Sequence, residues 1–558
     1  MKTYNIRLFL LLALIFIESA IIFGQTNTVG LLFNDSTNSF KGYTLFSPLK
    51  SKNTYLINMD GMLIRSWTSG YTPGQSVMLL PDGSILRPAT VTAGNPFVQG
   101  GVAGRVEKYD WSGNLTWSFN HYGATYTTHH DIEYMPNGNI LCIAFEKKTL
   151  SEAAAAGRNI TGANYTEVWS EKIIEVHPEG SSGGTIVWEW HIWDHLVQDY
   201  DPTKANYGNV ALNPGLFDIN FGDKKADWLH MNAIRYNPLR DEIMVSVHAT
   251  HEILIIDHST TTQQAAGHTG GNRGKGGDIL YRWGNPVAYK SGTAADQKLF
   301  SQHDARWIEP GYPGAGNILI FNNGTNRPGG AYSSIEEIVP PIGPDSLYIK
   351  TSGSAFGPSA PVWSYAAQPS SSFYSVNISG ATRMLNGNTL ICEGTSGRFF
   401  EVAPAGQTVW TYINPVGPSG PVTQGQTPVE NIVFKIYRYA PDYSGLAGRD
   451  LTPLGPIELY PSGIQVDESS SDGFEHFQNY PNPFSRFTKI SFLLRREEKV
   501  TLKVYNTLGQ ECITLYSGIL GSGTHSFDWD AGQFNSGIFF CSLQRGDKMS
   551  IMKIICIK

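Results

Sequence analysis

The sequence predicts an all-β protein with a six-bladed β-propeller followed by a small C-terminal β-sandwich. Its composition supports this class, because 59 Gly, 31 Pro and 13 Trp but only 16% charged residues in 558 are typical of turn-rich β structure. Apolar hairpins recur along the chain. Between them lie segments that join a polar residue to a turn and a short apolar strand, which is the signature of a repeat architecture.

The first 24 residues predict a secretory signal peptide. Lys2 and Arg7 precede an apolar run from Leu8 to Ile17, and polar residues begin at Gln25, the order used by export signals. A membrane anchor is the weaker interpretation, because Glu18 interrupts the run and the run is shorter than the roughly 20 residues that span a bilayer. We therefore expect no transmembrane segment in the mature chain.

Six hairpins can be counted after the signal peptide. They begin near Thr54, Arg105, Lys172, Glu252, Ile335 and Arg398. A last strand near Val433 follows the sixth hairpin and has no hairpin of its own. If this strand joins the first hairpin near Tyr55, the sheets close into a ring without free edges, as in a propeller. The predicted propeller domain covers residues 25–455.

The C-terminal part reads as a separate domain. Residues 456–475 are rich in Ser, Asp, Gly and Pro, which predicts a linker. Residues 476–558 contain short strands of alternating polarity, and these predict a β-sandwich.

Three histidines stand at the same place in the repeat. His130, His230 and His303 each come one or two residues before Asp or Asn and ahead of a turn and a short apolar strand. Equivalent positions in a ring of repeats converge near its axis, so we expect the three imidazoles to face one another. A role in packing is the preferred interpretation for five other histidines, namely His129, His191, His251, His258 and His268.

The motifs around these histidines resemble those of the bacterial arylsulfate sulfotransferases. The similar segments are 128–131, 187–195, 227–232 and 301–304, and the resemblance spans roughly residues 40–450. It implies a six-bladed propeller that moves a sulfuryl group from a phenolic sulfate ester to another phenol, without a nucleotide donor or other cofactor. It also implies that His303, in the Gln-His-Asp motif, becomes sulfated.

The resemblance and the chemistry of imidazole suggest roles for the predicted residues. Neutral imidazole has a reference pKa of about 6.5 and is a competent nucleophile near pH 7, so His303 is the expected nucleophile. His230, Asn232 and His130 are expected to donate hydrogen bonds to the sulfate oxygens or to the departing phenol oxygen. Asp304 is expected to orient the ring of His303.

A second set of residues is expected to bind the substrate. Tyr437 and Tyr439 are candidates for stacking on the aryl ring. Known family members carry a sulfate-binding Arg shortly after the His-x-Asn motif, where this chain has His248. Arg438 supplies the missing positive charge, or protonated His248 does so, or the activity has diverged.

Residues 476–558 resemble the C-terminal sorting domain of the type IX secretion system. The resemblance rests on the segments 477–484, 504–510 and 523–529. It implies that the secretion machinery is a partner and that the protein is secreted or held at the outer-membrane surface.

Two other classes of function stay open. Three converging imidazoles also suit Zn²⁺, and hence a metal-dependent hydrolase or lyase, although the family resemblance implies no metal. A non-catalytic surface propeller that binds ligands in its mouth is the other alternative. The net charge of −7 argues against a nucleic-acid partner. The glycine-rich run 267–277 lacks the spacing of a phosphate-binding loop and predicts a flexible loop.

Overall fold

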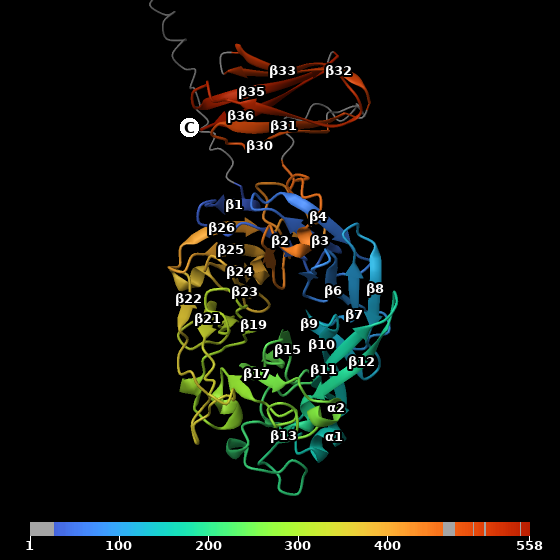
Figure 1. Cartoon of the computed structure of the whole chain (residues 1–558), viewed down its shortest axis with the longest axis vertical. Coiled ribbons are helices and arrows are strands. Elements are labelled where there is room, and N and C mark those ends of the chain that lie inside the picture. The colour runs from blue at the N-terminus through green and yellow to red at the C-terminus, as the bar shows by residue number, and fades with distance from the viewer. Residues whose placement is uncertain (1–26, 461–474, 495, 507–508, 547, 558) are drawn as a thin grey trace, which may run out of the picture. The chain divides into compact units, whose positions relative to one another are not determined.

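The computed structural model describes residues 27–460 and 475–557, apart from residues 495, 507–508 and 547. The predicted signal peptide and residues 461–474 of the predicted linker lie outside the described residues. The chain forms two compact units, of which one ends at Tyr460 and the other begins at Pro461. Strands dominate both units (Figure 1). In the described part of the chain, no helix has the length and apolar character needed to cross a membrane.

Six antiparallel sheets follow one another along the described part of the first unit (Figure 1). The first three, in hydrogen-bonding order, are β29 (Tyr437–Tyr439), β2 (Tyr43–Phe46), β3 (Asn53–Ile57) and β4 (Leu63–Thr68); β5 (Met78–Leu79), β6 (Ile85–Thr90), β7 (Gly104–Tyr109) and β8 (Leu115–Asn120); β9 (Tyr126–Tyr134), β10 (Ile140–Thr149), β11 (Glu167–Pro178) and β12 (Gly184–His191).

The other three sheets have the same hairpin connectivity. They are β15 (Met231–Asn237), β16 (Glu242–Val247), β17 (Glu252–Asp257) and β18 (Tyr281–Trp283); β19 (His303–Trp307), β20 (Ile318–Asn322), β21 (Ser334–Ile338) and β22 (Trp363–Tyr365); β23 (Gly380–Arg383), β24 (Thr389–Glu393), β25 (Arg398–Val402), β26 (Thr408–Ile413) and β1 (Gly30–Asn34).

Short elements lie in the connections between these sheets. The strand pairs are β13 (Leu196–Val197) with β14 (Phe217–Asp218) and β27 (Val416–Gly417) with β28 (Gly420–Pro421). The α-helices are α1 (Leu150–Ala155) and α2 (Thr262–Ala265), and the 3₁₀ helices are η1 (Ile192–Asp194), η2 (Val210–Leu212), η3 (Pro286–Tyr289), η4 (Ala294–Asp296), η5 (Ser370–Ser372), η6 (Gly394–Ser396) and η7 (Ser444–Leu446).

Two strand pairings join the beginning of the first unit to its end. β29 pairs with β2, and β2 pairs with β3, the strand that contains Tyr55. The expected pairing of the last strand with the N-terminal hairpin is therefore present. The pairing of β1 with the outer strand β26 was not predicted.

Residues just after the last sheet also belong to the first unit. Pro456 forms a bridge with Met62, and Ile457 and Glu458 are buried. The predicted linker, which was expected to start at residue 456, therefore begins later, because this segment buries an apolar side chain against the sheets.

Large apolar side chains fill the space between neighbouring sheets. One core cluster unites Phe46 and Tyr55 of the first sheet with Phe399 and Tyr412 of the sixth. The rings of Phe46 and Phe399 lie 5.1 Å apart at 64°, an edge-to-face geometry that aromatic pairs prefer. Neighbouring sheets thus bury their apolar faces against one another.

The second unit contains two antiparallel sheets. One is formed by β30 (Glu475–Tyr480), β31 (Phe487–Leu494) and β34 (Gly523–Asp530), the other by β33 (Glu511–Leu520), β32 (Glu498–Asn506), β35 (Gly537–Arg545) and β36 (Lys548–Cys556). Side chains from both sheets, including Trp529 and Val504, share one core.

Candidate active site

The first strand of several sheets has a backbone irregularity at the position where the repeat places a histidine. The register of β9, β15 and β19 with the following strand shifts there. His130 and His230 adopt φ of 53° and 55°, a left-handed conformation that is costly for a residue with a side chain. Bulges of this kind re-aim side chains. The corresponding left-handed residues, one in each of five sheets or just before it, are Gln75, His130, His230, Asp304 and Ser379.

Four imidazoles form a continuous series of ring contacts, which we call the histidine cluster. The ring centroids are 4.5 Å apart for His130 and His230, 5.5 Å for His230 and His248, and 5.6 Å for His248 and His303. Phe434 lies 6.0 Å from His130 and 6.3 Å from His303. The structure therefore brings together side chains separated by more than 170 positions in the sequence.

The ring of His303 is held in one tautomer. Its Nδ1 lies 2.8 Å from Oδ1 of Asn323 and 3.1 Å from the carbonyl oxygen of Ser301. Asn323 uses its amide nitrogen to donate to the carbonyls of Ser375 and Ile378, so its oxygen must face the imidazole. Nδ1 is therefore the protonated nitrogen, and Nε2 accepts a hydrogen bond of 3.2 Å from the N–H of Ile378. Its lone pair is on Nε2.

Burial keeps most of the cluster uncharged at neutral pH. Desolvation lowers the pKa of His303 to about 4 and, together with the nearby imidazoles, that of His248 to about 2. Burial and the adjacent imidazoles also lower the pKa of His130 well below its usual range. A neutral ring keeps its lone pair, so His303 meets the electronic requirement for a nucleophile.

A buried hydrogen-bonded chain leads to His130. Nδ1 of His130 is 2.9 Å from Nδ1 of His129, and Nε2 of His129 is 2.8 Å from a carboxyl oxygen of Glu171. The other oxygen of Glu171 accepts from the N–H of Met231. Burial raises the pKa of Glu171 well above its usual range and lowers that of His129 to about 3.

These protonation states set the direction of the chain. A neutral Glu171 donates to Nε2 of His129, and Nδ1 of His129 then donates to Nδ1 of His130. The remaining proton of His130 is on Nε2. His129 was expected to serve only in packing, and Glu171 was not singled out. The pair of adjacent histidines at 129–130 was the available sequence signal for His129. Glu171 is 41 residues from His130, and no sequence signal connects the two.

His230 has an acidic partner three residues earlier. Nδ1 of His230 donates to Asp227 over 2.6 Å, and the side chains are 20% and 1% exposed. Burial opposes ionisation of Asp227, but the hydrogen bond and charge of His230 outweigh it and lower the pKa of the carboxyl. An ionised Asp227 can stabilise a positive charge that forms on His230 during a reaction.

The structure corrects the role expected for Asp304. Its carboxylate accepts from Arg306 at 2.8 and 2.9 Å and from Arg235 at 2.6 Å, so it does not orient His303. Asn323, which the sequence did not indicate, has that position. The reason is local, because the bulge in β19 turns consecutive side chains in different directions.

Asp304 belongs instead to a buried ionic network that joins β9, β15, β19 and the segment before β29. Arg235 bridges Asp304 and Asp131, at 2.6 and 2.9 Å. Lys435 lies 2.6 Å from Asp131. Charges buried this completely are tolerated only when paired, so the network has a structural role.

The side chain of Asn232 contacts the residue that precedes His303. Its amide nitrogen donates to the carbonyl of Gln302 at 2.8 Å, directly before His303 in sequence. Its buried oxygen has no hydrogen-bond partner among the described residues. Asn232 therefore contacts the backbone next to His303.

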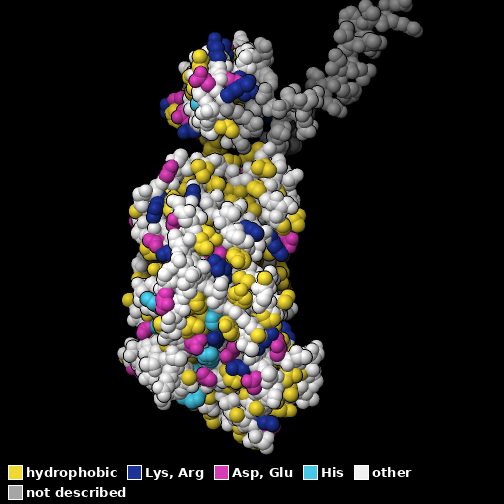
Figure 2. Space-filling model, turned by 90° about the vertical axis from the view of Figure 1, so that its right-hand side faces the viewer, with side chains coloured by type: hydrophobic (Ala, Val, Ile, Leu, Met, Phe, Trp, Pro, Cys, Tyr) yellow, Lys and Arg dark blue, Asp and Glu magenta, His cyan; other side chains and the backbone are white. Residues whose placement is uncertain are grey.

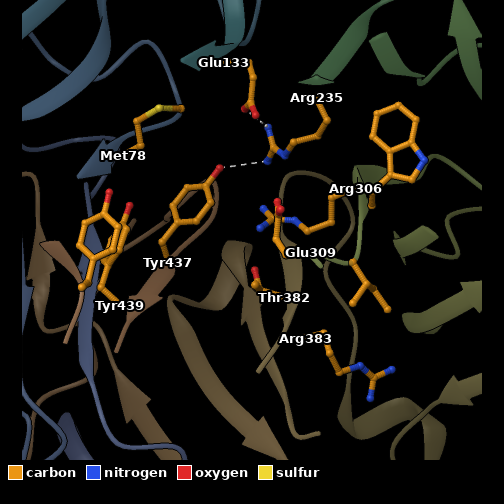
Figure 3. Close-up of a pocket in the computed structure, with 12 residues that line it drawn as sticks. Met78, Glu133, Arg235, Arg306, Glu309, Thr382, Arg383, Tyr437 and Tyr439 are labelled. Carbon is orange, nitrogen blue, oxygen red and sulfur yellow. Dashed lines mark hydrogen bonds and ion pairs between the residues drawn. The ribbon is translucent and has the colours of Figure 1, made fainter. Parts of the chain in front are cut away.

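The expected substrate-binding residues of β29 lie elsewhere. Arg438 is buried, forms an ion pair with Glu401 and donates to Thr44, so it does not supply a cation to the cluster. Tyr437 and Tyr439 line a separate cavity of about 300 Å³ that no histidine of the cluster lines (Figure 3). Alternation along the strand sends Arg438 to the opposite side from its two tyrosine neighbours.

Phe434 is the aromatic neighbour of the cluster that the sequence did not indicate. It is completely buried and precedes β29 by a few residues. Tyr437 lines the separate cavity described above, and its hydroxyl accepts a hydrogen bond from Arg235 there (Figure 3).

Comparisons with solved structures give weak similarities. They include a protein of unknown function from Bacteroides caccae, with 11% identity, a TM-score of 0.38 and coverage of 71% of this chain and 98% of that one. A periplasmic gluconolactonase of Pseudomonas aeruginosa has 10% identity and a TM-score of 0.32, and the match covers 88% of this chain and 99% of that one. A catalytically inactive virginiamycin B lyase of Staphylococcus aureus has 10% identity and a TM-score of 0.31, and the match covers 70% of this chain and 89% of that one. Similarity this low does not assign a function to this chain.

Sequence comparison with curated proteins gives no match, whereas two family models match. Residues 478–558 match the secretion system C-terminal sorting domain, here of the type IX system, which indicates export to the cell surface or the medium. Residues 81–419 match the arylsulfotransferase (ASST) family. Because the second match covers more than half of the chain and contains most of the histidine cluster's strands, the chain belongs to the arylsulfotransferase family.

Proposed function

We propose that the protein transfers a sulfuryl group from an aryl sulfate to a phenol through a sulfohistidine at His303. The observation that carries this proposal is the neutral, buried His303 with its lone pair on Nε2. The neighbouring imidazoles supply donors for sulfate oxygens, and Phe434 packs against the rings of His130 and His303. Family membership gives the reaction class.

In the first step, Nε2 of His303 gives up the hydrogen bond from the N–H of Ile378 and attacks the sulfur of the aryl sulfate. The N–S bond forms while the S–O bond to the aryl group breaks, and the electron pair of that bond leaves on the aryl oxygen. Nε2 of His130 gives its proton to this oxygen. The chain from Glu171 through His129 returns a proton to His130, and Glu171 is left as a carboxylate.

In the second step, an acceptor phenol reverses these events. Its proton goes to His130 and back along the chain to Glu171, and its oxygen attacks the sulfur. The N–S bond breaks and its electron pair returns to Nε2 of His303. Between the steps, Asn323 accepts from Nδ1 of the charged ring, which stabilises the intermediate.

Positive charge for the sulfate comes from imidazoles in this proposal. The Asp227–His230 pair stabilises a proton on His230 when an anion binds beside it. His248 takes the position at which known family members carry an Arg, and it donates through a ring nitrogen. Because an imidazole lacks the forked donors of a guanidinium, we expect weak binding of the donor.

The fold proposal follows from the strand order. Six sheets in sequence, joined at their ends by the β29–β2 and β1–β26 pairings, suit the blades of a six-bladed propeller closed by strands from both ends of the domain. We propose that the propeller extends over residues 25–455 and the following buried segment, and that the second unit is a β-sandwich.

The test is incubation with 4-nitrophenyl sulfate, followed by mass spectrometry of the His303 peptide. We expect a sulfo group on this peptide without acceptor and its loss after phenol is added, and His303→Ala should abolish turnover. The matched control is His258→Ala, since His258 pairs with Glu175 and Asp241 outside the cluster. Turnover that persists in His303→Ala contradicts the proposal.

The same assay separates the two alternatives. Chelator-sensitive turnover that leaves no sulfo group on the His303 peptide would favour a metal-dependent hydrolase or lyase. If the native protein and His303→Ala both bind the aryl sulfate and neither turns it over, a ligand-binding module would be favoured.

A further inference from the structure

Three segments of the first unit meet at a second group of histidine and acidic side chains. His195 directly follows η1, His268 lies in the glycine-rich segment after α2, and Asp278 precedes β18. One ligand atom of each residue lies within 4.8 Å of the others. In the described part of the chain this is the group of histidine, cysteine and carboxylate side chains close enough to share a metal ion.

His195 is already oriented as a metal ligand. Its Nε2 lies 2.8 Å from the carbonyl oxygen of Ala265 and must donate to it. Its ring is completely buried and stacks on Trp190 at 5.7 Å and 8°. Metal-binding histidines commonly donate their second nitrogen to a carbonyl, which fixes the tautomer and frees the other lone pair. That lone pair is on Nδ1.

The free lone pair faces an acceptor. Nδ1 of His195 is 2.8 Å from Oδ1 of Asp278, and Nδ1 of His268 is 2.7 Å from the same oxygen. One carboxylate oxygen therefore contacts two imidazole nitrogens. Imidazole nitrogens and carboxylate oxygens are the donor atoms that bind Zn²⁺ in proteins.

The group is open on one side. The side chain of His268 is 58% exposed and that of Asp278 is 17% exposed, while His195 is buried. Histidine side chains do reach the surface beside acidic ones on one face of the molecule (Figure 2). Tetrahedral Zn²⁺ with bonds of about 2.0–2.1 Å separates its ligand atoms by about 3.3 Å. Oδ1 of Asp278 lies 2.8 and 2.7 Å from the two imidazole nitrogens, so each of these distances has to lengthen by about 0.5 Å, and water can complete the site.

The glycine-rich segment is packed against this group. The N–H of Gly277 donates to the carbonyl of Gly267, and Nε1 of Trp190 donates to the carbonyl of Gly277. A Cβ atom at Gly277 would lie 2.5 Å from Nε2 of His195 and 2.0 Å from the carbonyl oxygen of Ala265. Only glycine permits this approach, so the segment expected to be a flexible loop makes specific contacts.

We propose that His195, His268 and Asp278 bind a divalent metal ion of the Zn²⁺ type, which fastens the glycine-rich segment to η1 and β18. Two imidazoles and one carboxylate suit Zn²⁺ and its first-row neighbours and do not suit Mg²⁺ or Ca²⁺, which prefer oxygen ligands. The ion has a structural role in this proposal. It is separate from the histidine cluster and takes no part in sulfuryl transfer.

The test uses the full-length secreted protein, stripped with a chelator and titrated with Co²⁺ while its visible absorption is recorded. We expect one equivalent with the intense spectrum of a tetrahedral site, displacement by Zn²⁺, and a higher Tm in the presence of Zn²⁺. His268→Ala and Asp278→Asn should each weaken binding by about 100-fold or more. His268 is exposed, so its loss leaves the fold intact.

Two controls make the result specific. His258→Ala removes another histidine that pairs with carboxylates and should leave binding unchanged. His230→Ala removes a member of the histidine cluster and should also leave it unchanged. Loss of the spectrum in His230→Ala alone would assign the ion to the cluster, and absence of saturable binding would reduce the group to a hydrogen-bonded triad. Either result overturns the proposal.

Discussion

Replacing Glu171 by Gln tests the buried chain that leads to His130. The amide has nearly the shape of the protonated carboxyl, and it can still accept from the N–H of Met231 and donate to Nε2 of His129. Because burial raises the pKa of Glu171 well above its usual range, the native side chain is neutral in the resting protein, and Glu171→Gln changes no charge there. The substitution removes only the transferable proton.

The expected cost is that of a missing general acid. Acid catalysis contributes about 10²–10⁴ in rate, or about 2.7–5.4 kcal/mol at about 1.36 kcal/mol per factor of ten. This loss should appear in kcat for donors whose phenol is weakly acidic, with a pKa of about 10 as for tyrosine, because such oxygens leave poorly without a proton. Donors that release an acidic nitrophenol should lose far less.

The assay is a series of aryl sulfates of graded leaving-group acidity, with kcat measured for each. We expect a steeper dependence on leaving-group pKa in Glu171→Gln than in the native protein, at similar KM. Glu175→Gln is the matched control, since Glu175 lies on the same strand and also binds a histidine, His258. A loss that is the same for every donor, or no loss at all, refutes the relay.

Three further predictions follow from the same geometry. His248→Arg should lower KM for aryl sulfates by about tenfold, because a charge-assisted bond is stronger than a neutral one by about 1.5 kcal/mol; an unchanged KM in initial-rate measurements would argue against contact with the sulfate. Burial lowers the pKa of His303 to about 4, so the neutral nucleophile is present above that pH and is lost below it. The pH profile of kcat/KM should therefore stay flat down to about pH 5, and an acid limb near the reference value of about 6.5 would contradict the assignment. Burial raises the pKa of Glu458 from 4.5 to about 7, so the fold loses stability as pH rises between these two values, where the unfolded carboxyl is ionised and the folded one is not, and loses no more above the upper one. Glu458→Gln should raise stability at pH 8 by up to about 3 kcal/mol and change it little well below the lower value, as measured by chemical denaturation.

The repeat could be found from sequence because its signals are local. A hairpin needs alternating apolar residues and a turn, and both lie within a dozen positions. The phase of the repeat then marks equivalent positions, which is how His130, His230 and His303 could be predicted to converge. His248 came from the family resemblance, and it does join the cluster.

Partners that come from other strands could not be found in this way. Glu171 reaches His129 from β11, Asn323 reaches His303 from the end of β20, and Phe434 arrives from the segment before β29. None of them occupies a position that the repeat marks. The side on which Arg438 emerges depends on the register of β29 with β2, which pairs residues almost 400 positions apart.

The sequence by itself predicted the β-rich class, the C-terminal sorting domain and the histidines that belong together. These properties depend on composition, on short-range alternation and on recurring motifs, all of which are properties of the linear order. Tertiary structure decided which nitrogen of His303 has the lone pair, which acid lies behind His130, and that Asp304 pairs with arginines. Bulges and cross-sheet contacts set these directions, because a turn of the backbone by one residue sends a side chain to a different neighbour.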